Sequence, residues 1–131
     1  MARVRFRVYL GDGHSVGPGK IQLLENVRDQ GSISAAARAM GMAYRHAWEL
    51  VDDMNQCFRT PVVETASGGR SGGGAQLTAL GAALIERFHS MEVSVQGAIA
   101  RDLEALEAEV APGQRGSGVQ TSRRRRVRTP R

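Results

Sequence analysis

Hydrophobic and polar positions change their period several times along the chain, and each change marks a predicted element. From Val4 to Leu10, apolar residues alternate with arginines and a tyrosine, which predicts a half-buried strand with a cationic outer face. Those arginines can contact phosphate or protect an exposed sheet edge. Residues 11–19 are rich in turn formers and predict a loop. Apolar positions from Ile21 to Val27 then predict a helix that ends at the next glycine.

Residues 32–56 predict two helices joined by a tight turn. Ser32 or Ser34 can cap the first helix, whose alanine run has high helix propensity. Gly41 follows, where a helix commonly ends at positive φ. The second helix is expected from about Ala43. Its predicted buried stripe contains Tyr44, Ala47, Trp48, Val51 and Met54.

This arrangement is typical of a helix-turn-helix, whose second helix can enter the DNA major groove. An ordinary helical hairpin has the same local pattern, so the flanking segments decide between the two interpretations. Trp48 is expected to be structural, because removal of a buried indole leaves a large cavity.

A short hairpin is predicted directly after the second helix. Pro61 breaks the chain, Val62 to Thr65 read as a strand, and residues 75–77 read as its partner. The connecting residues 67–74 are mostly glycine, with Arg70 near the tip. Such a hairpin is the wing of a winged helix; a flexible hairpin without a contact role is the alternative. A nucleotide phosphate cradle is not expected, because GxxxxGK[ST] is absent.

One long helix is predicted from Ala79 to about Val110, capped by Thr78 and interrupted or bent at Gly81 or Gly97. Its apolar seam contains Leu84, Phe88, Met91, Val95, Ile99, Leu103, Leu106 and Val110. This seam is longer than a domain of this size needs, so pairing with a second copy in a two-fold dimer is expected. The alternative is a helix that folds back on its own core.

The net charge of +5 is unevenly distributed. Residues 113–131 hold seven arginines and no acid, whereas residues 1–74 hold nine basic and seven acidic groups and residues 75–112 hold two and six. A cationic N-terminal part is expected where phosphates bind. We therefore expect one domain over residues 1–111, including the helix at about 78–110, and a disordered arginine-rich tail over 112–131. The tail adds phosphate attraction or only aids solubility.

Several other classes of function find little support. No apolar run approaches the ~20 residues that cross a bilayer, so a cytoplasmic, nucleoid-associated protein without membrane contact is expected. Cys57 is the single cysteine and is expected to be a packing residue. His14 has no second ligand at metal spacing, so no metal and no cofactor are expected. The sequence shows neither a nucleophile paired with a base nor a pair of carboxylates at a recognisable spacing, so an enzyme is not expected.

Two segments resemble a known family: GKIQLLENVRDQGSISAAARAMGMAYRHAWELVDDMNQ and VVETASGGRSGGGAQLTALGAALIERF. They are similar to the N-terminal DNA-binding domain of the ModE family of molybdate-responsive transcription regulators, which is related in layout to LysR-type winged helices. The resemblance covers roughly residues 2 to 105. It implies a dimeric bacterial repressor or activator in which the helix from Tyr44 reads the major groove and the wing lies on the backbone.

The chain departs from that family in two respects. Ala43 stands where family members usually have Ser or Thr, so the recognition helix lacks that cap. Family regulators that sense molybdate use a C-terminal oxyanion-binding domain, for which this chain leaves no length. We therefore expect DNA binding without a sensor domain of its own. Regulation then comes from a separate effector or sensor protein, or the chain binds DNA constitutively.

These patterns predict a mainly α fold with a small β wing: a winged helix-turn-helix with an N-terminal strand and a long C-terminal dimerisation helix. The predicted function is a homodimeric, sequence-specific transcription regulator that binds double-stranded DNA. A winged-helix adaptor that binds a protein partner is the alternative. The residues expected at the DNA are Ser34, Ala43, Tyr44, Arg45, His46, Glu49, Arg70 and Ser71.

Overall fold

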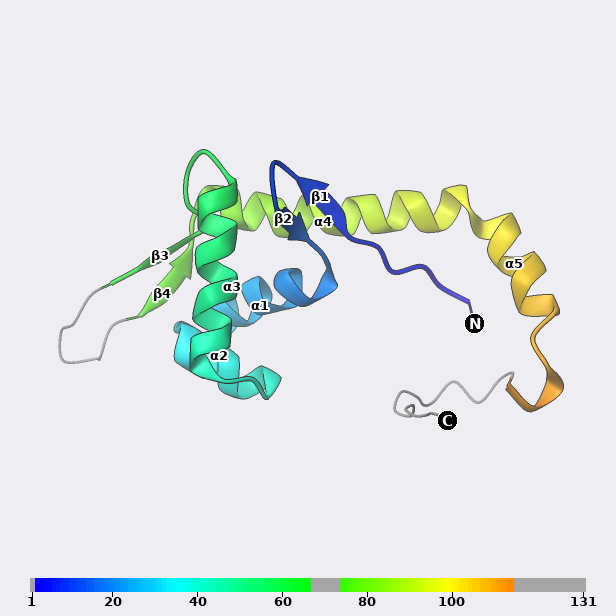
Figure 1. The fold of residues 1–131 in the computed structure, drawn as a ribbon, viewed down its shortest axis with the longest axis horizontal. Helices are drawn as coiled ribbons and strands as arrows, with labels where there is room; N and C mark the ends of the chain where they lie inside the picture. Colours follow the sequence, from blue (N-terminus) through cyan, green and yellow to red (C-terminus); the bar gives the residue numbers. More distant parts are fainter. Residues whose placement is uncertain (1, 67–73, 115–131) are drawn as a thin grey trace. The chain divides into compact units, whose positions relative to one another are not determined.

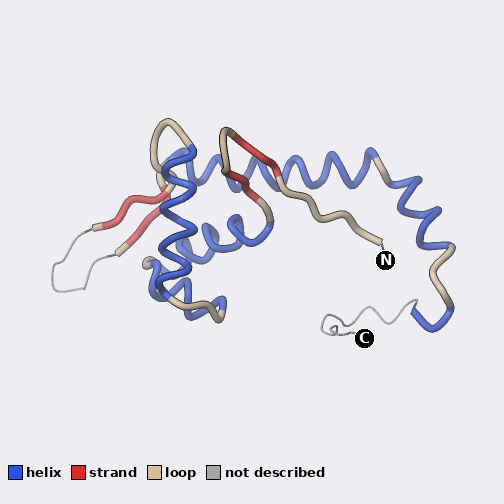
Figure 2. Tube along the Cα trace, viewed as in Figure 1, coloured by secondary structure: helices blue, strands red, loops and turns tan. Residues whose placement is uncertain are grey.

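The computed structural model describes residues 2–66 and 74–114, which form helices and two short hairpins (Figures 1 and 2). The elements are β1 (Val8–Leu10), β2 (His14–Val16), α1 (Pro18–Gln30), α2 (Ile33–Met40), α3 (Tyr44–Cys57), β3 (Val63–Thr65), β4 (Ala75–Leu77), α4 (Ala79–Ala98), α5 (Ala100–Ala108) and the 3-10 helix η1 (Pro112–Gln114). The chain divides into two compact units. We call Arg5–Glu92 the head and the remainder, Met1–Val4 with Val93–Arg131, the second unit.

Helices α1, α2 and α3 form the predicted helix-turn-helix and the helix before it. The α1 helix ends at Gly31, whose φ is 81°, and α2 ends at Gly41, whose φ is 69°. Side chains with a Cβ are strained at these values, which explains a glycine at both turns. Ser32 caps α2, because its Oγ accepts the backbone N–H of Ala35 at 3.0 Å. The sequence prediction of this motif is confirmed.

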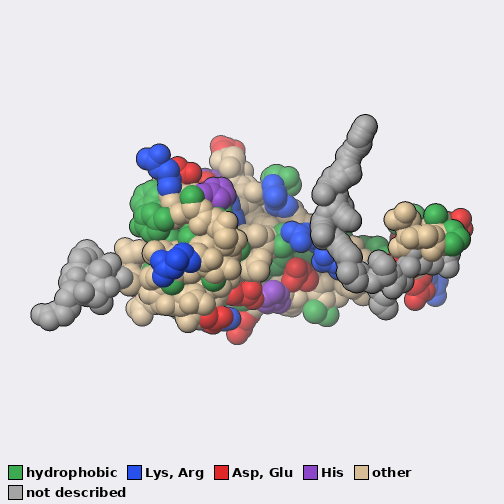
Figure 3. All heavy atoms as spheres, turned by 90° about the horizontal axis from the view of Figure 1, so that it is seen from below, with side chains coloured by type: hydrophobic (Ala, Val, Ile, Leu, Met, Phe, Trp, Pro, Cys, Tyr) green, Lys and Arg blue, Asp and Glu red, His purple; other side chains and the backbone are tan. Residues whose placement is uncertain are grey.

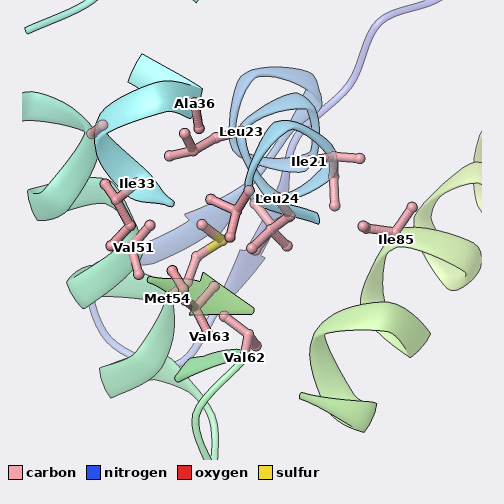
Figure 4. Packing of buried hydrophobic residues seen from close by; sticks show 14 of the residues in the cluster. Ile21, Leu23, Leu24, Ile33, Ala36, Val51, Met54, Val62, Val63 and Ile85 are labelled. Atoms are coloured by element: carbon pink, nitrogen blue, oxygen red, sulfur yellow. The ribbon is translucent and has the colours of Figure 1, made fainter. Parts of the chain in front are cut away.

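The head has one apolar core, to which α1, α2, α3, β3 and α4 all contribute side chains (Figure 4). Leu23, Leu24 and Val27 of α1 lie at its centre and are fully buried. From α3, the buried residues are Ala47, Val51 and Met54. Burial at about 25 cal/mol per Å² of apolar surface makes this cluster the main source of the head's stability.

The predicted stripe of α3 is too wide, and the placement of Trp48 in the core is wrong. The Trp48 side chain is 45% exposed and Tyr44 is 55% exposed. Both positions fall at the edge of the stripe centred on Ala47 and Val51, where the surface of α3 turns away from the core. The indole is therefore a surface feature of the head.

Both hairpins are antiparallel. In the N-terminal hairpin, Val8 pairs with Val16 and Leu10 with His14. Exposure alternates along residues 2–10 as predicted, but the strand begins only at Val8, and β2 lies in the segment predicted as a loop. In the second hairpin, the wing, Val63 of β3 pairs with Leu77 of β4, as the sequence predicted to within one residue.

Helix α4 begins after a capped turn that also fixes the start of the wing. Thr78 Oγ1 accepts the Gly81 N–H at 3.0 Å and donates to the Pro61 carbonyl at 2.7 Å. The helix continues through Gly81 and ends at Ala98; Ile99 separates it from α5. The interruption therefore lies beside Gly97, one of the two predicted positions.

The predicted apolar seam divides between the two units. Phe88 is 1% exposed, and its ring centroid lies 5.1 Å from that of Phe6. Leu84 and Met91 pack partly buried against the same core. Phe88 as a dimer contact is therefore wrong, because its ring is already enclosed by the head. Helix α4 covers the head with this part of the seam.

The rest of the seam belongs to the second unit. Val95, Ile99 and Leu103 are partly exposed there, and Leu106 is 67% exposed. Helix α5 buries none of its residues. Gln96 holds the N-terminal arm, because its Oε1 accepts the Val4 N–H at 3.2 Å. Of the predicted tail, Pro112–Gln114 form η1, and residues 115–131 lie outside the described part.

Candidate nucleic-acid interface

The first two turns of α3 expose the predicted DNA-contacting side chains. Tyr44, Arg45, His46 and Glu49 are all exposed, while Ala47 between them is fully buried. One edge of the helix is thereby fixed in the core and the other is open to a ligand. An exposed, polar edge at the start of a second motif helix has the geometry that a recognition helix needs. What these four side chains contact stays a prediction.

The start of α2 adds groups that sequence reasoning only partly identified. Ser34 is exposed, and its Oγ accepts a hydrogen bond from Arg38 Nη1 at 3.0 Å. Arg38 was not predicted, although its i, i+4 spacing from Ser34 was a readable signal. Ala43 is exposed at the N-cap of α3 and makes no side-chain cap, as the sequence predicted. Together these residues place one guanidinium and one hydroxyl beside the recognition helix.

A recess lies between α2, α3 and the base of the wing. We call it the aromatic hollow and define it by Ser32, Ser34, Tyr44, Trp48, Thr65 and Ala75, which line it together with their neighbours. Its volume is about 470 Å³. Trp48 and Thr65 were absent from the predicted site, because the periodicity placed Trp48 in the core and gave Thr65 no distinguishing signal. Arg70 and Ser71 lie outside the described residues, so their contact with the DNA backbone stays a prediction.

The wing is formed by β3 and β4 (Figure 1), and hydrogen bonds fix both strands against the helices. Asn55, near the end of α3, accepts the N–H of Val62 at 2.7 Å, just before β3. The N–H of Ala75, at the start of β4, donates to the Gly31 carbonyl at 2.8 Å. The first bond ties the wing to the recognition helix, and the second ties it to the turn between α1 and α2. The hollow between these elements is therefore a fixed feature of the head.

An ion network holds the C-terminal half of α3 against the N-terminal hairpin. Asp53 Oδ2 accepts from Lys20 Nζ at 2.7 Å, and its Oδ1 lies 3.1 Å from His14 Nδ1. The hydrogen bond from Lys20, and to a smaller extent the one from His14, holds the pKa of the Asp53 carboxyl below its ordinary value. His14 thus has a structural partner. Within residues 2–66 and 74–114, no three His, Cys, Asp or Glu side chains are grouped to hold a metal ion.

Basic side chains are dispersed over the head. On the face that Figure 3 shows, Lys and Arg lie as separate groups among acidic and uncharged side chains. Of the basic side chains of α1, Arg28 is paired with Asp29, with Nε and Oδ1 2.9 Å apart. Attraction for phosphate on this face is therefore local to individual arginines and is not spread over a continuous basic patch. No helix in the described part of the chain is long and apolar enough to cross a membrane.

Comparison with known proteins agrees with this geometry. Residues 19–87 match the bacterial regulatory helix-turn-helix proteins of the lysR family. The chain is 43% identical over 96 residues to the molybdenum-pterin-binding protein MopA of Rhodobacter capsulatus, covering 73% of this chain and 35% of MopA. It is 37% identical over 101 residues to the molybdenum transport protein ModE of Azotobacter vinelandii, covering 77% of this chain and 37% of that protein.

A third relative is named for DNA binding. The chain is 42% identical over 71 residues to the DNA-binding transcriptional dual regulator ModE of Escherichia coli K12, covering 54% of this chain and 27% of the regulator. The chain thus spans about a third of the length of these relatives. The family match runs from the start of α1 into α4 and includes the helix-turn-helix and the wing. By this match over more than half of its residues, the chain belongs to the lysR family of bacterial regulatory helix-turn-helix proteins.

Proposed function

We propose that this protein is a sequence-specific, DNA-binding transcription regulator that acts as a homodimer. The observation that carries the proposal is the two-sided placement of α3: Ala47 and Val51 are buried in the core, and Arg45, His46 and Glu49 are exposed. A helix fixed in this way can enter the major groove without rearrangement of the head. The similarity of the same residues to DNA-binding regulators supports this assignment.

In the proposed complex, the exposed edge of α3 reads base edges. Arg45 can donate to a guanine through two N–H groups, and Glu49 can accept from the amino group of a cytosine. Tyr44 and His46 flank these two residues and meet bases or the sugar-phosphate backbone. Ser34 and Ala43 lie next to the same edge, at the starts of α2 and α3. Direct readout of this kind makes affinity depend on the DNA sequence.

The homodimer would use the second unit. Val95, Ile99, Leu103 and Leu106 leave apolar surface uncovered along the end of α4 and along α5, and a second copy is an economical cover for it. A two-fold pair presents two α3 helices to half-sites about 34 to 36 Å apart, or a multiple of that distance. Dimerisation then doubles the number of bases read and selects two-fold symmetric sites.

Selection of bound duplexes from a random DNA pool tests the proposal. We expect a two-fold symmetric consensus, and a binding constant for random duplex that falls steeply with salt concentration. A protein-binding adaptor need not bind random duplex at all. Absence of binding at every salt concentration would therefore reject the proposal. Light scattering on the same protein, with Leu103→Lys as the variant, tests the dimer: the wild type should have the mass of two chains and the variant that of one.

The relatives named above also suggest which genes are regulated. Their names place them in molybdenum transport and molybdenum-pterin binding. We propose that the selected consensus occurs upstream of genes for the uptake or use of molybdenum. Mapping the DNA fragments that the full chain binds in its own genome tests this; binding sites scattered without relation to such genes would reject it.

A further inference from the structure

The aromatic hollow is lined by two large aromatic side chains that are exposed although they lie beside the core. Trp48 is 45% exposed and Tyr44 is 55% exposed, although both lie beside the core on the helix that the core fixes. Large aromatic side chains that stay exposed together mark contact surfaces more often than scattered single ones do. The hollow therefore has the character of a binding surface.

The chemistry of the hollow selects the kind of occupant. None of the described residues that line it is charged, and Ser32, Ser34, Tyr44 and Thr65 each present a hydroxyl group. Hydroxyls can donate to phosphate oxygens, and aromatic faces pack against the apolar side of a deoxyribose. An occupant with alternating anionic and apolar groups matches this lining. Among the described lining residues, no carboxylate repels it.

The position of the hollow indicates which molecule occupies it. It lies between the first turns of α3, which we propose to enter the major groove, and the base of the wing. The sugar-phosphate strand separates one groove of DNA from the next, so it passes over the surface between the recognition helix and the wing. The hollow is thus continuous with the proposed interface, and the hydrogen bonds of Asn55 and Gly31 keep its walls in place.

We propose that the aromatic hollow seats one sugar-phosphate segment of the bound DNA. Trp48 and Tyr44 pack against deoxyribose, and the hydroxyls of Ser34 and Thr65 donate to phosphate oxygens. This inference rests on the proposed function and deepens it by identifying a contact without charge. Because Trp48 and Tyr44 carry no charge and contact deoxyribose, not base edges, their contribution to affinity is insensitive to DNA sequence and does not alter the salt dependence.

Trp48 is the single tryptophan of the chain, so its fluorescence reports directly on the hollow. The full chain is titrated with the selected duplex and with a random duplex, and acrylamide quenching of Trp48 is measured with and without DNA. We expect both duplexes to change the emission and to reduce the quenching constant at least twofold. The midpoint should coincide with that from fluorescence anisotropy of labelled DNA.

Variants separate this contact from other roles. Trp48→Ala should weaken binding to both duplexes by a similar factor, on the order of tenfold, with an unchanged slope of log K against log salt. Trp48→Phe should recover most of the loss. Tyr9→Ala, which removes an exposed aromatic from β1, is the matched control and should bind like the wild type.

The remaining outcomes overturn the proposal in recognisable ways. Unchanged quenching of the wild type on saturation with DNA means that the hollow is empty in the complex, and this result stands even where Trp48→Ala fails to fold. A loss confined to the selected duplex makes Trp48 a base-reading residue. A failure of the proposed function itself is distinct, because the wild type then gives no anisotropy change with any duplex.

Discussion

Asn55 and Val63 are joined by two hydrogen bonds that run in opposite directions. The Asn55 side-chain amide donates from Nδ2 to the Val63 carbonyl at 3.1 Å, and its Oδ1 accepts the Val63 N–H at 3.2 Å. The same Oδ1 accepts the Val62 N–H at 2.7 Å. The Asn55 side chain, near the end of α3, thus pairs with both backbone groups of Val63, as the backbone of a neighbouring strand would. The orientation of the wing is set from α3.

Replacing Asn55 with alanine should therefore affect both stability and DNA binding. Val62 and Val63 are buried, so their N–H groups lose their partner without gaining water. We expect the free energy of unfolding in urea to fall by about 1 to 3 kcal/mol. We also expect weaker binding to selected and random duplex alike, because the base of the wing is no longer held to α3.

The matched control is Asn26→Ala on α1. Asn26 is also an asparagine with a hydrogen bond to a backbone carbonyl, that of Gln22, but this bond is exposed and lies within one helix. Its stability should change by no more than about 0.5 kcal/mol. Equal stability of the two variants would contradict the role given to Asn55.

Two glycines of α4 should respond in opposite directions to the same substitution. A Cβ at Gly81 would collide with the Val62 carbonyl oxygen, whereas a Cβ at Gly97 meets nothing. Alanine is favoured over glycine in a helix by roughly 0.5 to 1 kcal/mol. Gly97→Ala should therefore raise the free energy of unfolding by up to that amount.

Gly81→Ala should instead be destabilised, because the backbone between the wing and the start of α4 has to move. Thermal unfolding followed by circular dichroism measures both variants. A gain in melting temperature for Gly81→Ala would mean that the packing of α4 against Val62 is looser than described.

The sequence predicted most of the head because local signals and tertiary packing agree there. Gly31 and Gly41 mark turns that require positive φ, and Thr78 caps α4 as expected. The prediction failed where burial depends on neighbouring elements of the fold. A period of 3.6 residues places Trp48 near the core stripe, but only the packing of α3 in the folded head determines where the buried stripe ends.

The apolar seam of α4 shows a second limit of sequence reasoning. Its positions recur regularly, yet periodicity does not distinguish a partner within the chain from one in a second copy. Phe6 and the core of the head cover Phe88, and the seam is uncovered only from Val95 onward. The long-range bonds of Asn55 left no sequence signal, because they join a helix to a strand across an irregular turn.

Arg45→Ala distinguishes base reading from phosphate attraction. If Arg45 reads a base, its loss should cost about 1 to 3 kcal/mol on the selected site and far less on random duplex. Arg87→Ala, an exposed arginine of α4, is the control and should change neither value appreciably. Anisotropy titrations of all three proteins with both duplexes measure the difference. Equal losses on both duplexes would assign Arg45 to a phosphate.

His89 should make the attachment of α4 to α1 dependent on pH. Its Nε2 lies 2.7 Å from Glu25 Oε2 and its Nδ1 lies 2.8 Å from Glu92 Oε1. Only the protonated ring donates from both nitrogens. The hydrogen bond to Glu25, followed by that to Glu92, raises the pKa of His89 above its ordinary value of 6.5. Its stabilising contribution is therefore fully present below pH 6.5 and is lost as the pH rises through the raised value.

The measurement compares the wild type with His89→Gln by urea unfolding at pH 5.5 and at pH 9, at one protein concentration. Because the His89 ring is protonated at pH 5.5 and loses its proton as the pH rises through its raised pKa, the stability advantage of the wild type should be larger at pH 5.5 than at pH 9. His46→Gln is the matched control, because His46 is exposed and has no ion pair in the described part of the chain. An advantage that is equal at both pH values, or larger at pH 9, would mean that the neutral ring holds the two helices as well as the charged one.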